Sequence, residues 1–211
     1  MDVNLTKSLF ILFLPLVSFI YQIFFGKRLG RSTHYVSISI IAAVLYLSIS
    51  FLIQSISKGY GTILETSTVW FASTDFNVHL GIFIDNITAI MLCVVALISF
   101  LVHIYSTEYM KDDPRYSRYF GFLGIFTFSM NGIVLADSLI MMYIFWELVG
   151  LSSYLLIGFW FEKDSAANAC KKAFLTNRVG DIGMFIGIMI LFFNVGSFNI
   201  NEIIYGTKAM N

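Results

Sequence analysis

The chain has few charged residues, cysteines and prolines for its length. Charged residues make up 12% of the 211 positions, whereas they make up about a quarter of a soluble globular domain. The two cysteines, Cys93 and Cys170, fall within or beside apolar runs and form no close-spaced metal or redox motif. The formal net charge is zero, and no basic block is long enough to favour nucleic acid. A disulfide-stapled domain and a nucleic-acid partner are therefore excluded.

The sequence also lacks the short motifs that bind nucleotides and redox cofactors. It contains no G-x-G-x-x-G, no P-loop, no C-x-x-C and no H-E-x-x-H, and no pair of histidines placed to hold a haem. We therefore expect no nucleotide, flavin, haem or iron-sulfur cluster in this chain. A catalytic cycle that it serves must be driven by a partner or by an ion gradient.

Long apolar runs dominate what is present. Hydrophobic residues make up 58% of the chain, and a helix of about 20 residues crosses the roughly 30 Å hydrocarbon core of a bilayer. We predict an all-α polytopic membrane protein with about six transmembrane helices. The expected spans are Ser8 to Phe25, Tyr35 to Ile56, Asn86 to Tyr105, Tyr119 to Leu135, Ser138 to Trp160 and Ala166 to Asn194. The last is too long for a bare crossing, so its first turns should project into the interface.

The basic residues predict the orientation. Nine of the 13 Lys and Arg residues fall at alternate span ends, three fall on the opposite side, and Arg178 lies within a span. The positive-inside rule then places the basic loops in the cytoplasm or matrix and both termini outside.

Two shorter elements are expected outside the bilayer. Residues 58 to 85 are polar and rich in turn residues, and apolar and polar positions alternate from Phe76 to Asp85 with the period of a strand. With Val69 to Phe71 ahead of a turn at Ser73 to Asp75, this pattern predicts a small external β-hairpin. The tail from Ser197 to Asn211 predicts a short interfacial helix. The chain then divides into 1–60 with the first two spans, 61–135 with the hairpin and spans three and four, and 136–211 with spans five and six.

Glu147 is the most informative residue, because it lies near the middle of an otherwise apolar span. A carboxylate there costs roughly 2.5 to 3.5 kcal/mol on insertion scales and usually marks a proton or ion route. Glu147, Gly150, Tyr154 and Gly158 recur at steps of three and four, so they share one helix face. Small residues let another helix approach, which would hold Glu147 against protein or internal water. The alternative is a permanently protonated glutamate with a structural role.

The sixth span carries Arg178 and Asp181, three residues apart on one side of the helix and able to pair. Gly180, Gly183 and Gly187 form a strip of small residues nearby. Asp181 and Glu147 should lie at similar depth near the midplane. Arg178 could instead extend toward the cytoplasmic side, which leaves a structural and a functional interpretation of the pair open.

Four segments carry a resemblance to a known family: FIDNITAIMLCVVALISFLVHIYSTEYM, YSRYFGFLGIF, ADSLIMMYIFWELVGLSSYLLIGFW and KKAFLTNRVGDIGMFIGI. From about Trp70 to Asn201 the chain resembles the antiporter-like chain 5, or subunit L, of proton-pumping NADH:quinone oxidoreductase, respiratory complex I. The resemblance implies that Glu147 is the key glutamate of the family's fifth helix. It also implies that Arg178 and Asp181 are the charged pair of the sixth, with Lys172 as a lysine just before them.

The resemblance implies a proton-translocating membrane-arm subunit that couples electron transfer from NADH to quinone to proton pumping. Such a chain is part of an enzyme but has no redox centre, since NADH, flavin, iron-sulfur clusters and quinone belong to partner subunits. Its partners would be the bilayer, other membrane-arm subunits and the remainder of the same subunit. Family members are longer, and the lysine that partners the glutamate falls beyond Asn211, so this chain resembles an amino-terminal fragment.

Two alternatives stay open. Multisubunit sodium/proton antiporters and membrane hydrogenases carry a similar subunit, and a non-transporting structural subunit would use its polar residues only to hold helices together. For the leading interpretation, the expected membrane is the bacterial inner (plasma) membrane or the mitochondrial inner membrane.

Overall fold

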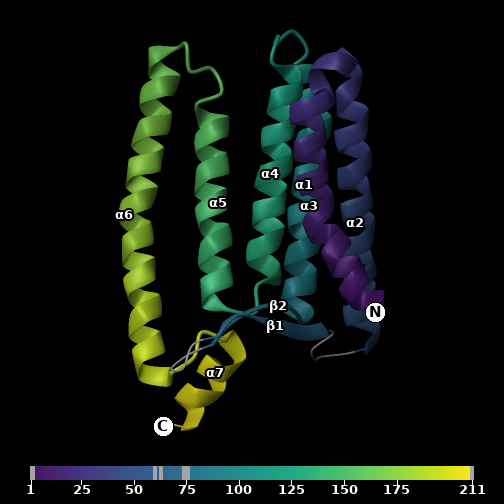
Figure 1. Cartoon of the computed structure of the whole chain (residues 1–211). Helices are drawn as coiled ribbons and strands as arrows, with labels where there is room; N and C mark the ends of the chain where they lie inside the picture. Colours follow the sequence, from purple (N-terminus) through teal and green to yellow (C-terminus); the bar gives the residue numbers. More distant parts are fainter. Residues whose placement is uncertain (1–2, 59–60, 62–63, 73–76, 210–211) are drawn as a thin grey trace.

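The computed structural model describes residues 3–58, 61, 64–72 and 77–209, and these residues form six long helices that run side by side (Figure 1). Each of the six is long and apolar enough to cross a membrane. The helices are α1 (Val3–Leu29), α2 (Thr33–Lys58), α3 (Asn86–Tyr109), α4 (Tyr116–Leu135), α5 (Leu139–Ile157) and α6 (Asp164–Val195). A 3-10 turn, η1 (Gly30–Ser32), joins α1 to α2. The prediction of six membrane helices is therefore confirmed.

The helices are arranged as a four-helix bundle with a pair attached to one side. Helices α1 to α4 pack against one another, α5 packs on α4, and α6 packs chiefly on α5 (Figure 1). Helix α4 is the central element. Of an apolar 18-residue stretch of α4, 56% is buried inside the protein, whereas only 11% of the corresponding stretch is buried in α5 and in α6. Close packing on α4 depends on Gly124, where a Cβ would lie 3.0 Å from the carbonyl oxygen of Pro15 in α1.

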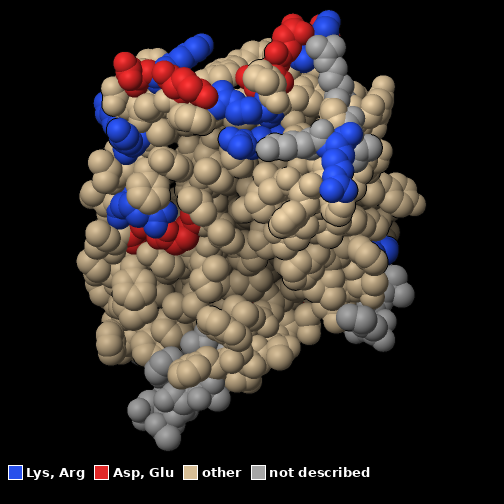
Figure 2. All heavy atoms as spheres, turned by 45° about the horizontal axis from the view of Figure 1, so that its top comes forward, with Lys and Arg blue, Asp and Glu red and all other residues tan. Residues whose placement is uncertain are grey.

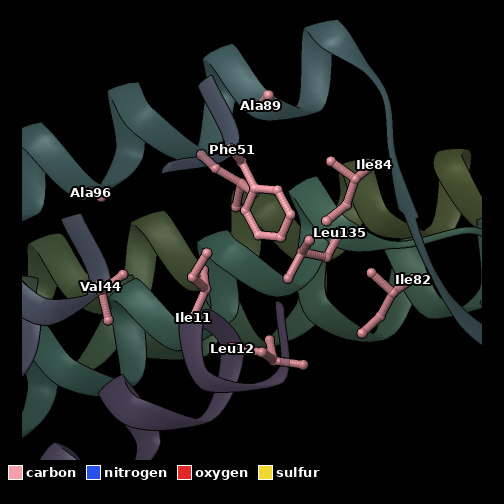
Figure 3. Packing of buried hydrophobic residues seen from close by; sticks show 10 residues of the cluster. Ile11, Leu12, Val44, Phe51, Ile82, Ile84, Ala89, Ala96 and Leu135 are labelled. Atoms are coloured by element: carbon pink, nitrogen blue, oxygen red, sulfur yellow. The ribbon is translucent and has the colours of Figure 1, made fainter. Parts of the chain in front are cut away.

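The apolar core lies inside the four-helix bundle, toward the hairpin (Figure 3). Ile11 from α1, Val44 and Phe51 from α2, and Leu135 from α4 are fully buried there. The core residues come from one stripe on each helix, and the opposite sides of the helices expose large apolar side chains. Exposed apolar surface on every outer face is the pattern of a bundle whose solvent is lipid.

An antiparallel hairpin closes one end of the bundle. Its strands are β1 (Leu64–Ala72) and β2 (Asn77–Ile84), with a bulge between Val69 and Phe71. The first strand is longer than the sequence predicted, and the turn predicted at Ser73 to Asp75 lies outside the described residues. The short tail helix is also present, as α7 (Ile200–Ala209).

Backbone pairing ties the hairpin end together. Ile82 of β2 bridges to Ala136, and Ser138 bridges to Asn199 in the connection between α6 and α7. Ser138 also begins α5, since its hydroxyl accepts a hydrogen bond from the backbone N–H of Met141. The junction between α4 and α5 is therefore fixed to both the hairpin and the tail.

The observed helices extend beyond the predicted spans at most ends. With 32 residues, α6 is roughly 48 Å long, so it exceeds the hydrocarbon thickness as expected. Both described ends of the chain lie at the hairpin end, and the loops between α1 and α2, α3 and α4, and α5 and α6 lie at the other (Figure 1). This alternation agrees with six crossings, while the side of the membrane on which the termini lie stays a prediction.

Candidate functional site

The candidate site lies at the contact between α5 and α6. The face of α5 predicted from spacing is the one that meets α6. A Cβ on Gly150 would lie 3.3 Å from Arg178 Nη2, and one on Gly158 would lie 3.0 Å from Cys170 Sγ. Between these two points, Tyr154 packs edge to face on Phe174, with ring centroids 5.4 Å apart. Gly150 and Gly158, on either side of the contact between Tyr154 and Phe174, therefore let α5 and α6 approach each other.

Three charged side chains meet on this seam. Arg178 donates a hydrogen bond from Nη1 to Glu147 Oε2, and its Nε lies 3.4 Å from Asp181 Oδ2. Arg178 therefore bridges one carboxylate on α5 and one on its own helix. The alternative in which its side chain extends away toward the basic end is wrong.

Two aromatic side chains complete the cluster. The indole of Trp146 donates a hydrogen bond from Nε1 to Asp181 Oδ1 at 2.9 Å, and the Arg178 guanidinium lies 4.8 Å from the centroid of the Phe174 ring. Both oxygens of Asp181 thus face a donor or a cation. The Oε1 atom of Glu147 has no hydrogen-bond partner among the described residues.

Exposure distinguishes the two carboxylates. The side chain of Asp181 is 6% exposed, that of Glu147 24% and that of Arg178 32%. Glu147 borders a cavity of about 460 Å³ whose other lining is almost wholly apolar, formed by Tyr143, Ile144, Leu148, Leu151, Phe174 and Arg178. Asp181 is enclosed, whereas Glu147 can be reached from this cavity.

The cluster can hold one exchangeable proton. A guanidinium stays protonated in proteins, so Arg178 supplies one fixed positive charge against two carboxyl groups. One proton on either carboxyl group makes the cluster neutral by charge count, and loss of that proton leaves one excess negative charge. Protonated Glu147 would also bind Arg178 less strongly, so the proton and the ion pair are coupled.

Lys172 and the glycine strip do not join this cluster. Lys172 is exposed on α6, and no ion pair in the described part of the chain includes it. Gly180, Gly183 and Gly187 have nothing within 4 Å of an added Cβ. The roles predicted for Glu147, Arg178, Asp181 and Lys172 stay predictions, but only the first three lie together.

Sequence reasoning did not single out Asp137, which lies between α4 and α5. Its side chain is 4% exposed, and Oδ1 accepts a hydrogen bond from the backbone N–H of Gly81 in β2 at 2.9 Å. Its Oδ2 atom is buried without a hydrogen-bond partner. Burial raises the pKa of this carboxyl, although the Gly81 N–H acts in the opposite direction. Its position next to an apolar run was the only sequence signal available.

The fold and the site together define a polytopic membrane protein with an intramembrane carboxylate–arginine cluster. Two family models match: NADH-Ubiquinone oxidoreductase (complex I), chain 5 N-terminus, over residues 70–120, and NADH:quinone oxidoreductase/Mrp antiporter, TM, over residues 136–211. Together they cover more than half of the chain. The chain belongs to the family of antiporter-like chain 5 subunits.

Curated relatives from plants agree with this assignment. The chain is 44% identical over 177 residues to the chloroplastic NAD(P)H-quinone oxidoreductase subunit 5 of Piper cenocladum, covering 84% of this chain and 24% of that protein. For Malvaviscus arboreus the identity is 41% over 190 residues, covering 87% and 27%. The chain therefore spans about a quarter of the length of these relatives.

A solved structure shares the fold. It is the membrane-bound sulfane sulfur reductase, an archaeal respiratory membrane complex, whose matching chain superposes with a TM-score of 0.76 and 18% sequence identity. The match covers 93% of this chain and 39% of the other. The helical arrangement described above is therefore a fold that a chain of this membrane complex shares.

Proposed function

We propose that this chain forms the amino-terminal helices of a proton-translocating membrane-arm subunit of an NAD(P)H:quinone oxidoreductase. The single observation that carries the proposal is the bridge from Glu147 through Arg178 to Asp181, which crosses the seam between two membrane helices. Family membership supports a redox partner, and the cluster supports Glu147 as a group that would gain and lose a proton.

In this proposal Glu147 is the proton carrier and Asp181 is a fixed anion. Glu147 has one oxygen free of hydrogen bonds and borders a cavity, whereas both oxygens of Asp181 are engaged. When Glu147 takes up a proton, its attraction to Arg178 weakens, and Arg178 pairs more fully with Asp181. A second cation that approaches Glu147 would reverse this change, so charge displacement in the rest of the subunit would drive proton release. Lys172, exposed on the same helix, would tune the electrostatic potential along the way.

The redox chemistry belongs to partners under this proposal. The chain would contain no redox centre, and NAD(P)H, flavin, iron-sulfur clusters and quinone would be bound by other subunits. The remainder of the subunit and neighbouring membrane-arm subunits would cover α5 and α6, whose surfaces are largely uncovered. The bacterial plasma membrane and the mitochondrial inner membrane stay the proposed locations, and the names of the relatives add chloroplast membranes to them.

The test is Glu147→Gln in the complete subunit within its complex, reconstituted in sealed vesicles. Glutamine keeps the size of the side chain but cannot carry a proton, so NADH-driven acidification per NADH oxidised should fall while the complex still assembles. Glu162→Gln is the matched control, since Glu162 is an exposed loop glutamate paired with Arg115. An assembled E147Q complex that transports as many protons as the unmodified one would leave only the structural role.

The second candidate is a subunit of a sodium/proton antiporter, favoured by the Mrp antiporter description of the matching segment. The same vesicles distinguish it: an antiporter moves protons when a sodium gradient is imposed without NADH. Proton movement driven by sodium alone, and lost in E147Q, would favour this candidate.

A further inference from the structure

A second cavity lies toward the end of the molecule opposite the hairpin, between α4, the end of α5 and α6. Its volume is about 320 Å³, and it shares no lining residue with the cavity beside Glu147. Most of its wall is apolar, with Phe122 from α4, Leu155 from α5, and Phe159 and Phe161 from the following loop. The volume is in the range of small-molecule sites, which run from about 300 to 1,000 Å³.

Two cations line this otherwise apolar cavity: Arg118 near the start of α4 and Lys171 on α6. Both side chains are exposed, no acidic side chain lines the cavity, and no ion pair within the described residues engages either charge. Neighbouring cations differ in this respect. Arg115 binds Glu162 through two hydrogen bonds of 2.7 and 3.1 Å. The cavity therefore has two positive charges that the chain itself does not neutralise.

The position of the cations matches the headgroup region of a bilayer. Lys171 lies seven residues after the start of α6, about 10 Å along a helix that is roughly 48 Å long and exceeds the hydrocarbon core by more than that. Lys and Arg gather at this end of the molecule (Figure 2). Arg118 and Lys171 thus lie where lipid phosphates are found, and Phe122 lies about one helical turn further along α4 than Arg118, on the hydrocarbon side.

We propose that this cavity binds an anionic phospholipid, with its phosphate between Arg118 and Lys171 and part of an acyl chain against Phe122 and Leu155. Basic pockets between membrane helices on the cytoplasmic or matrix side are a recurring site for anionic headgroups. A free phosphate ion would use the two cations but none of the apolar wall, so the combination favours the lipid. Tyr154 lines the cavity and packs on Phe174 of α6, so a bound lipid would contact the two helices that hold Glu147 and Arg178.

The experiment is native mass spectrometry of the chain extracted from phosphatidylcholine bilayers that contain a minority of phosphatidylglycerol. The unmodified chain should retain phosphatidylglycerol in preference to phosphatidylcholine. Each of Arg118→Gln and Lys171→Gln should lower that retention about fivefold, and the double variant about 25-fold. Arg28→Gln is the control, since Arg28 is an exposed cation outside the cavity. The charge-preserving pair Arg118→Lys and Lys171→Arg should retain the lipid.

A third variant separates lipid from free anion. Ala167 lines the cavity, so Ala167→Phe should fill part of the apolar volume without changing the charge. Under the proposal this variant also loses phosphatidylglycerol, and soluble glycerol phosphate does not displace the lipid from the unmodified chain. Equal retention of both lipids by the unmodified chain would overturn the proposal. So would displacement by glycerol phosphate together with unchanged binding in A167F, which would indicate a site for small anions.

Discussion

Trp146 and Asp181 lie on neighbouring helices, and the indole Nε1–H donates a hydrogen bond of 2.9 Å to Asp181 Oδ1. The same carboxylate faces Arg178 Nε through its other oxygen at 3.4 Å. Asp181 is therefore held from both sides, and Trp146 acts on the charged cluster from the residue next to Glu147. Under the proposed function, the indole holds in place the carboxylate with which Arg178 pairs more fully when Glu147 is neutral.

Trp146→Phe should weaken this arrangement without opening a large gap. Phenylalanine lacks the N–H donor and the five-membered part of the indole, but Trp146 is 48% exposed, so we expect a loss of about 1 kcal/mol in the free energy of unfolding, in the range for polar contacts between membrane helices. The measurement is a double-mutant cycle with Asp181→Ala, which removes the acceptor, in detergent or bicelles. The two losses should not add, because they remove the same hydrogen bond. Strictly additive losses would mean that the bond contributes nothing; Trp70→Phe on the exposed surface of β1 is the control.

Gly150 should tolerate only the smallest side chain. A Cβ at this position lies 3.3 Å from Arg178 Nη2, so Gly150→Ala requires a shift of a few tenths of an ångström, whereas Gly150→Leu displaces the guanidinium from Glu147. We expect G150A to keep most of the proton transport of the complete subunit and G150L to resemble E147Q. Transport per NADH oxidised and the amount of assembled complex are the two readouts. An assembled G150L complex with full transport would contradict the link between the Arg178 position and transport.

Asp137 gives a pH dependence with a defined sign. Burial raises the pKa of this carboxyl in the folded chain, so the folded state binds more protons than the unfolded state above the ordinary value near 4. Stability should therefore fall as the pH rises from that value through the raised one, and it should be fully retained below both. Asp137→Asn cannot ionise and still offers an acceptor to Gly81, so its thermal midpoint should depend less on pH.

Two further variants test the Asp137 interpretation. Asp164→Asn removes an exposed carboxylate and should leave the pH profile of the thermal midpoint unchanged. Asp137→Ala removes the acceptor itself and should cost about 1 to 3 kcal/mol at every pH, because the Gly81 N–H loses its partner. A D137N profile as steep as that of the unmodified chain would assign the dependence to another group.

Local sequence patterns predicted the elements that depend on neighbouring residues. Runs of about 20 apolar residues locate the six helices, and steps of three and four place Glu147, Gly150 and Tyr154 on the face that meets α6. Spacing of three also predicts the contact between Arg178 and Asp181. These features depend on the residues of a single helix, so they can be predicted from the sequence.

Contacts that depend on how the helices are rotated or joined could not be predicted from the sequence. Trp146 lies about 100° around α5 from Glu147, so its bond to Asp181 depends on where α6 lies. Asp137 meets Gly81, 56 positions earlier in the sequence, only because the hairpin folds back against the start of α5. Lys172 is six residues before Arg178 and points elsewhere, whereas Lys171, at seven residues, lies within about 20° of the Arg178 face and lines the second cavity.

Arg178→Lys should separate charge from geometry in the cluster. Lysine keeps the positive charge, but its single ammonium cannot contact Glu147 and Asp181 as a planar fork does, nor lie over Phe174 in the same way. Because the bridge couples the proton on Glu147 to the position of the cation, we expect R178K to assemble, with transport per NADH oxidised reduced about tenfold, which corresponds to a loss of 1.4 kcal/mol. Arg28→Lys, which makes the same exchange on the surface, should transport normally. Full transport in R178K would show that a positive charge between the helices suffices and that the bridging geometry is not required.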